Sequence, residues 1–275
     1  MPDDLLLRLR RFHDDYFPGV QDRFQALVDE GQHPSTLFIG CSDSRLMPYL
    51  LTGTGPGELF IIRNVGAFVP PHDGFVAGPQ DACGVGPPGG RTPLEAARRW
   101  VGYHGTAAAI EFAVLKLNVA RIVVCGHSHC GGIRALYEEP MPQAPNLAAW
   151  LELGREAALP VQLTPEALRR TEQRSVVLQL ERLMHYPMVR ERVEAGTLAL
   201  HGWHYVIEDG EVHVFDVRSG SFVPASSAEH SGTGPFDSAP VDDGSSLFNE
   251  IDAAWGPAPH KLVVDQPGEA PGKAG

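Results

Sequence analysis

Two polar stretches, each directly after an apolar run, constrain this chain more than any other feature of its sequence. The first, residues 40–45, reads GCSDSR and follows the apolar run TLFI. The second, residues 125–132, reads CGHSHCGG and follows the run IVV. Short apolar runs of this kind predict buried strands, and sites in an open parallel sheet form where the strands end. The side chains that we expect to meet at one rim of such a sheet are Cys41, Asp43, His127 and Cys130.

The residue types in these stretches indicate a zinc site. Two thiolates and one imidazole, from Cys41, Cys130 and His127, suit Zn²⁺. Three protein ligands leave a fourth position for a water, whose pKa falls to about 7 on the metal. Asp43 could occupy that position itself and close the site. Arg45 lies two residues further and could hold Asp43 bidentately, away from the metal.

The order C-x-D-x-R and then H-x-x-C resembles the β-class carbonic anhydrases, over roughly residues 20 to 220. Other segments fall in the same family-like order: Gln32-His33-Pro34, the strand-like segment from Phe60 to Gly66, Tyr103-His104-Gly105-Thr106 and His201-Gly202-Trp203. The resemblance implies one Zn²⁺ per chain and reversible hydration of carbon dioxide to bicarbonate and a proton, by attack of zinc-bound hydroxide. It implies Asp43 and Arg45 as the catalytic pair, with Asp43 as fourth ligand in a closed state.

The resemblance also suggests residues around the substrate. Gly105 lies beside the zinc-bound solvent in the family, and Phe38 and Val65 are predicted from their positions to line an apolar pocket for carbon dioxide. Some β-class enzymes hold an inhibitory bicarbonate with a Trp, the arginine equivalent to Arg63 and a Tyr. Phe38 stands at the Trp position and lacks the indole donor, so the sequence leaves open whether such a regulatory site exists. His129 is expected to face outward rather than to bind the metal or shuttle protons.

Two alternatives remain open from the sequence. Hydrolases of carbon disulfide or carbonyl sulfide resemble this family, and a Pro/Gly-rich insertion at about 70–93 could reshape the entrance. A non-catalytic structural zinc or binding module would need a permanent fourth ligand. Arg45 argues against that last alternative, because it can draw Asp43 off the metal.

Composition limits partners and compartment. The net charge of −12 argues against nucleic acid or an anionic membrane as the main partner. The chain has four cysteines, too few for a disulfide scaffold, and Cys125 lies inside a predicted strand as a core residue. Thiolate ligands favour a reducing compartment, and neither a signal peptide nor an apolar run of about 18 residues is found. We therefore expect a cytoplasmic enzyme, and the resemblance implies a homodimer or a larger homo-oligomer.

The predicted fold class is α/β, with a mostly parallel central sheet flanked by helices. Helices are predicted between residues 4 and 30, with an interruption at Pro18-Gly19. A C-terminal β-hairpin is predicted around Asp209-Gly210. Further helices are predicted from Thr106, as N-cap, to Leu117 and from Thr164, as N-cap, to about Tyr186. Residues 1–223 would form the zinc domain, including the insertion, and residues 224–275 a disordered tail.

Overall fold

The structure is a computed structural model that describes residues 4–72, 104–228 and 232. Most of the predicted insertion and of the predicted C-terminal tail lies outside these ranges. The described residues belong to two compact units, one containing the helices up to Glu30 and the other beginning at Gly31.

The N-terminal unit is a continuous run of helix. It comprises α1 (Asp4–Arg11), the π-helical turn η1 (Phe12–Tyr16) and α2 (Phe17–Glu30). The predicted interruption at Pro18-Gly19 is wrong, because Pro18 falls in the first turn of α2. There the chain leaves a π-turn, in which the Phe17 N–H donates to the Phe12 carbonyl five residues back. The wider turn accommodates a proline ring that would clash inside a regular helix.

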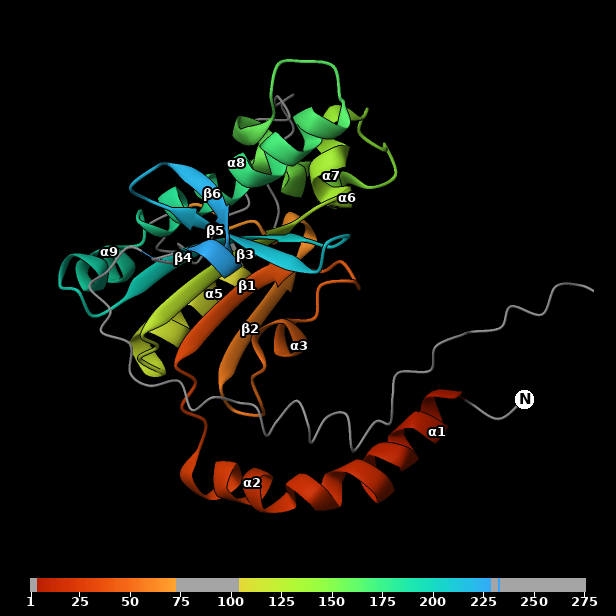
Figure 1. Ribbon diagram of the computed structural model, residues 1–275, viewed down its shortest axis with the longest axis vertical. Helices are drawn as coiled ribbons and strands as arrows, with labels where there is room; N and C mark the ends of the chain where they lie inside the picture. Colours follow the sequence, from red (N-terminus) through yellow and green to blue (C-terminus); the bar gives the residue numbers. More distant parts are fainter. Residues whose placement is uncertain (1–3, 73–103, 229–231, 233–275) are drawn as a thin grey trace, which may run out of the picture. The chain divides into compact units, whose positions relative to one another are not determined.

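The second unit is built on a six-stranded sheet in the order β2-β1-β3-β4-β5-β6 (Figure 1). The strands are β1 (Thr36–Cys41), β2 (Leu59–Asn64), β3 (Arg121–His127), β4 (Ala199–Val206), β5 (Glu211–Asp216) and β6 (Ser221–Pro224). Strands β1 to β4 are parallel, and β5 and β6 are antiparallel. The predicted fold class is confirmed, and Asp209-Gly210 joins β4 to β5 with Gly210 at φ 67°. The short strand β6 was not predicted.

The strand order makes the end of β1 a natural binding position. From β1 the chain passes to β2 on one side, and it later returns to place β3 on the other. Loops leaving β1 and β3 therefore diverge in opposite directions, and such a topological switch point opens a crevice at the carboxyl ends of the strands. Both stretches that the sequence singled out lie there.

The core explains why β1 and β3 read as continuous apolar runs. All six residues of β1 are buried. Leu37 packs into one core cluster, together with Ile122 and Val124 of β3, whereas Phe38 packs with Val123 into another. Parallel strands covered on both faces lose the alternation of polar and apolar residues.

Helices surround the sheet. They are α3 (Pro48–Thr52), η2 (Val65–Ala67), α5 (Gly105–Glu111), η3 (Phe112–Lys116), α6 (Gly131–Arg134), η4 (Ala135–Tyr137), α7 (Pro145–Leu151), η5 (Glu152–Ala157), α8 (Pro165–Leu183), α9 (Pro187–Glu194) and η6 (Ala225–Ser227). Helix α8 packs against β3 and β4 (Figure 1). The approach is close, because a Cβ atom on Gly126 would lie 2.8 Å from Val176 Cγ2. Helix α8 can therefore bring side chains directly beneath the loop that follows β3.

The start of α5 differs from the prediction. The helix begins at Gly105, and His104 rather than Thr106 occupies the N-cap position. The Thr106 hydroxyl instead lies 3.3 Å from Asn64 Nδ2, so it ties the helix to the end of β2.

Thr164 is the N-cap of α8, as predicted, and its Oγ1 accepts a hydrogen bond of 3.1 Å from the Ala167 N–H. We expect Thr164→Ala to lower the free energy of unfolding by about 1 kcal/mol, because that amide loses its partner. Thermal unfolding of the variant measures this loss, and Thr164→Ser, which keeps the hydroxyl, is the control. Equal stability of the alanine variant and the wild type would contradict the capping role.

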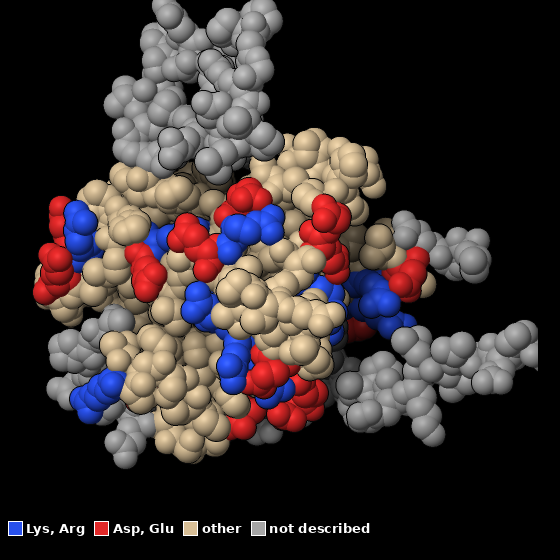
Figure 2. Space-filling model, turned by 90° about the horizontal axis from the view of Figure 1, so that it is seen from above, with Lys and Arg blue, Asp and Glu red and all other residues tan. Residues whose placement is uncertain are grey.

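Charge on the surface is mixed. On the described part of the face in Figure 2, Lys and Arg side chains are interspersed with Asp and Glu. This distribution lacks the basic stripe by which nucleic-acid-binding proteins follow a phosphate backbone.

Within the described ranges, no helix combines the length and the apolar character needed to cross a membrane.

Candidate metal centre

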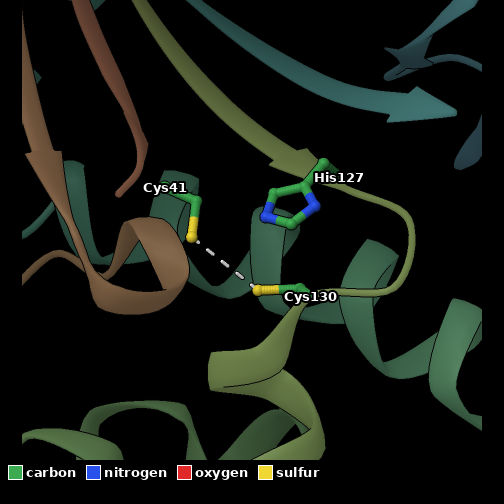
Figure 3. A group of neighbouring side chains, drawn as sticks. All are labelled: Cys41, His127 and Cys130. Carbon is green, nitrogen blue, oxygen red and sulfur yellow. Dashed lines mark hydrogen bonds between the residues drawn. The ribbon is translucent and has the colours of Figure 1, made fainter. Parts of the chain in front are cut away.

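Strand ends bring the three expected metal ligands together. Cys41 is the last residue of β1 and His127 the last of β3, and these strands are parallel neighbours. Cys130 follows at the N-cap of α6. The three ligand atoms lie within 4.8 Å of one another, and all three side chains are buried (Figure 3).

The donor atoms fit zinc in kind and in spacing. Cys41 Sγ and Cys130 Sγ are 3.9 Å apart, close to the roughly 3.8 Å that two thiolates at 2.3 Å would show on one tetrahedral Zn²⁺. The Nδ1–H of His127 donates to the Ser128 carbonyl at 2.8 Å. Its Nε2 is buried and has no hydrogen-bond partner among the described residues. A buried ring nitrogen beside two thiols fits a metal ligand, because a metal-binding histidine typically donates its other ring N–H to a carbonyl or a carboxylate.

The three side chains of this cluster shift one another's pKa values. The hydrogen bond from Cys130 lowers the pKa of Cys41 to about 4. The Cys41 thiolate accepts that hydrogen bond and, together with burial, raises the pKa of Cys130 well above its usual value. Burial lowers the pKa of His127, but the nearby Cys41 thiolate and the hydrogen bond to the Ser128 carbonyl outweigh it, and the pKa is raised. Ionising both buried thiols therefore requires a nearby positive charge, which a divalent cation would supply.

Asp43 and Arg45 form a bidentate ion pair beside the cluster. Arg45 Nε and Nη2 donate to the two carboxylate oxygens of Asp43 at 2.9 and 2.7 Å. These hydrogen bonds hold the pKa of Asp43 well below its usual range. Asp43 Oδ2 lies 3.8 Å from His127 Nε2, so the carboxylate faces the cluster without joining it. A second bond from Arg45 Nη2, to the His129 carbonyl at 3.1 Å, anchors the pair to the other loop.

Arg63 supports the same loop from β2. Its Nε donates to the Cys41 carbonyl at 3.0 Å, and its Nη2 donates to the Asp43 carbonyl at 2.6 Å. A charge within an apolar run needs partners. The observed partners are two carbonyls of the metal loop, so Arg63 fixes the backbone on both sides of Ser42.

We expect Arg63→Met to lower the free energy of unfolding by about 1–3 kcal/mol, because two carbonyls lose hydrogen bonds from a charged donor. Denaturant unfolding measures the loss. Arg63→Lys keeps the charge without the planar guanidinium, so its stability should fall between those of the wild type and Arg63→Met. A methionine variant as stable as the wild type would show that the loop holds its shape without Arg63.

The three residues predicted to line the substrate pocket differ in their exposure to solvent. Gly105 is exposed at the first turn of α5. Val65 is 38% exposed and lies beside Gly132 of α6, near the metal loop. Phe38 has no exposed surface, and its ring packs edge-on against Trp203 at 6.2 Å. Contact with carbon dioxide stays a prediction for all three.

Two neighbours of the ligands behave as expected. His129 lies outward at φ 55°, with a side chain 55% exposed and Nε2 3.4 Å from Glu208 Oε1. Cys125 is fully buried in the core cluster that contains Phe38.

Sequence reasoning missed one pair of buried polar residues behind the cluster. Glu172 on α8 and His204 on β4 are 2% and 0% exposed and contact each other at 3.1 Å. A signal was available in α8, where Glu172, Ser175 and Gln179 recur at spacings of three and four among apolar residues. Polar side chains along a buried stripe need partners.

Comparison with known proteins agrees with this geometry. A family model described as carbonic anhydrase matches residues 36–212. The chain belongs to the β-carbonic anhydrase family. This match spans the whole sheet as far as the start of β5, and it includes every residue of the cluster and of the Asp43–Arg45 pair.

Curated relatives extend the match over most of the chain. A carbonic anhydrase of Pseudomonas aeruginosa is 38% identical over 233 residues, which cover 82% of this chain and 92% of the relative. One from Synechococcus elongatus is 36% identical over 216 residues, covering 76% of this chain and 69% of the relative.

Solved structures of this family share the fold. The β-carbonic anhydrase CcaA aligns with a TM-score of 0.67 at 31% identity, covering 84% of this chain and 93% of that chain. A chain from the tetrameric β-carbonic anhydrases of Sordaria macrospora aligns with a TM-score of 0.59 at 25% identity, covering 80% of this chain and 97% of that chain.

Proposed function

We propose that this chain catalyses the reversible hydration of carbon dioxide to bicarbonate and a proton, on one Zn²⁺ held by Cys41, His127 and Cys130. The observation that carries the proposal is the convergence of two thiols and a free imidazole Nε2 beside a bidentate Asp43–Arg45 pair. The relatives named carbonic anhydrase support the same activity.

Zinc, when bound, acts as a Lewis acid that brings the pKa of a bound water to about 7, so that a nucleophile is available near neutral pH. The protein supplies the orientation. Asp43, ionised and therefore only an acceptor, fixes the attacking oxygen by accepting its hydrogen bond. Arg45 holds the Asp43 carboxylate in place and prevents it from taking the fourth metal position itself.

The second contact of Arg45 coordinates the two loops. Because Arg45 binds both the Asp43 carboxylate and the His129 carbonyl, the loop after β1 and the loop after β3 are held in one arrangement. A displacement of either loop by about 1 Å would misplace the acceptor relative to the reacting oxygen, which is the kind of error that costs an enzyme about a hundredfold in rate.

Stopped-flow measurement of carbon dioxide hydration tests the proposal. The purified chain would be assayed from about pH 6.5 to 9, which brackets the pKa of a zinc-bound water, with bound zinc quantified in the same sample. We expect turnover across this range, since Arg45 holds Asp43 off the metal. Absence of turnover at one zinc per chain would overturn the proposal. Hydrolysis of carbon disulfide or carbonyl sulfide by that sample would then identify the alternative enzyme. If neither compound is hydrolysed, the zinc is structural.

We further propose that the chain assembles into a homodimer or a larger homo-oligomer. The apolar side chains of α1 lie exposed, Leu5 at 70% and Leu9 at 65%, and exposed apolar surface of this kind marks interaction sites. The Sordaria macrospora relatives are tetrameric. Light scattering of the purified chain would give the assembly, and a monomer at micromolar concentration would contradict the proposal.

Compartment and domain limits complete the proposal. Thiolate ligands favour reducing conditions, which the cytoplasm provides. The zinc domain would comprise residues 1–223, within which the family match falls, and residues 224–275 would form a separate tail. A truncated chain ending at 223 that keeps zinc and activity would support this division.

A further inference from the structure

Glu172 is a buried carboxylate with both oxygens engaged. Its side chain is 2% exposed, and a buried carboxylate is costly unless its acceptor positions are filled. Oε1 accepts a hydrogen bond of 3.0 Å from the backbone N–H of Cys130. Oε2 lies 3.1 Å from His204 Nε2, which donates to it. The carboxylate thus connects α8, β4 and the loop between β3 and α6.

The amide that Glu172 accepts from belongs to a proposed zinc ligand. Cys130 follows His129, which adopts φ 55°, a conformation that non-glycine residues rarely hold without support. The Cys130 amide is also at the N-cap of α6, where helical partners for N–H groups are absent. The hydrogen bond to Glu172 therefore fixes the backbone from which Cys130 Sγ reaches the metal.

His204 holds Glu172 in place. Its ring is fully buried on β4, and the edge of the Phe222 ring lies against it with centroids 6.3 Å apart. The imidazole has little freedom to rotate, so its N–H presents one fixed donor to Oε2. A carboxylate fixed at one oxygen offers the other to Cys130 in a single orientation.

Glu172 lines two spaces. It lines the small interior space bounded by Cys41, His127 and Cys130. It also lines a cavity of about 360 Å³ next to Ser128 and Glu208. Truncation of Glu172 would therefore enlarge the space beside the metal ligands, in addition to freeing the Cys130 amide.

We propose that Glu172, oriented by His204, is a positioning residue for Cys130 and sets the affinity of the centre for zinc. This inference rests on the proposed function only in requiring zinc at this centre. Partners that orient a metal ligand typically contribute 10- to 100-fold in metal affinity. The effect belongs to metal binding, and changes in turnover follow from it.

The test uses the full chain loaded with zinc. Competition with a chelator of known affinity gives the zinc dissociation constant, and substitution by Co²⁺ gives the thiolate-to-metal charge-transfer band. We expect Glu172→Ala to raise the dissociation constant about 10- to 100-fold and to shift the band. Glu172→Gln keeps a carbonyl acceptor for the Cys130 amide and should recover most of the affinity. His204→Leu should shift the band in the same direction as Glu172→Ala.

Thr171→Val is the matched control. Thr171 is fully buried on the same helix, and its hydroxyl bonds to Tyr137 and to the Ala167 carbonyl rather than to the metal loop. We expect it to lower thermal stability and to leave the zinc affinity and the Co²⁺ band unchanged. Equal loss of affinity in Thr171→Val would assign the effect to general loosening and overturn the inference.

Other outcomes separate the two proposals. A wild-type dissociation constant in Glu172→Ala overturns the inference. If that variant fails to fold, His204→Leu decides, and an unshifted Co²⁺ band in His204→Leu overturns the inference. A wild-type chain that binds zinc but hydrates no carbon dioxide defeats the proposed function alone, and the affinity changes would still support the role of Glu172.

Discussion

Replacing Cys41 by serine is expected to remove zinc from this chain and to abolish hydration of carbon dioxide. The serine hydroxyl does not ionise near neutral pH, so the centre loses one of its two anionic donors, and ligands of this kind must be deprotonated to bind the metal. We expect less than about a tenth of a zinc per chain after dialysis against a weak chelator, since the remaining imidazole and thiolate leave a two-ligand site. The rate should fall to that of buffer. Metal analysis and stopped-flow hydration of one sample measure both.

Cys125→Ala is the control for this prediction. Cys125 is a cysteine of the same region, fully buried in the core, and burial raises the pKa of its thiol well above the usual value. Its loss leaves only a small cavity, and the variant should keep one zinc per chain and wild-type activity. Stoichiometric zinc in Cys41→Ser would contradict the assignment of Cys41 as a ligand. Loss of zinc in Cys125→Ala would show that zinc is lost through destabilisation of the fold, so the loss in Cys41→Ser could not be assigned to coordination.

Arg45→Ala should keep zinc and lose about a hundredfold or more in hydration rate. Without Arg45, the Asp43 carboxylate loses its bidentate partner and is free to move toward the metal position, since its Oδ2 is already 3.8 Å from His127 Nε2. The fourth position would then be closed, and the attacking oxygen would lose its acceptor. Removal of one preorganised hydrogen-bonding group commonly costs 10²- to 10³-fold in rate. Stopped-flow hydration measures the loss of rate, and zinc analysis of the same sample shows whether the metal is retained.

The pH dependence of this loss distinguishes its cause. Arg45 lowers the pKa of Asp43, so its removal lets that pKa rise toward the ordinary value of about 3.9. Asp43 stays ionised above pH 6 in both proteins, and the loss should be uniform from about pH 6.5 to 9 because it arises from position, not from protonation. Arg134→Ala, at an exposed position on α6, is the matched control and should be fully active. Wild-type turnover in Arg45→Ala would contradict the role of the pair.

Much of the fold and the ligand cluster could be predicted because the decisive signals are local. The apolar run before Cys41 marks β1, and the run before His127 marks β3. The parallel arrangement then brings both strand ends to one rim. Thr164 caps α8 as its position before Pro165 indicates, since the cap forms within one turn of chain.

Signals that depend on tertiary contacts could not be predicted in the same way. The partners of Arg63 are backbone carbonyls of another strand's loop, and no sequence pattern identifies a carbonyl as an acceptor. Thr106 resembles an N-cap, but its hydroxyl bonds to Asn64, which only folding places nearby. Pro18 reads as a helix breaker because the π-turn that accommodates it has no recognised sequence pattern. Glu172 acts through the Cys130 amide, a contact that exists only because Gly126 lets α8 approach.

The most direct test of the account is a zinc titration of the metal-free chain, followed by its rate of carbon dioxide hydration. The protein would be stripped with a chelator and returned to buffer at about pH 8, where a zinc-bound water is largely ionised. The account predicts that the rate rises in proportion to added zinc and reaches a plateau at one equivalent per chain. A rate independent of zinc, or a plateau without activity at one bound zinc, would contradict it.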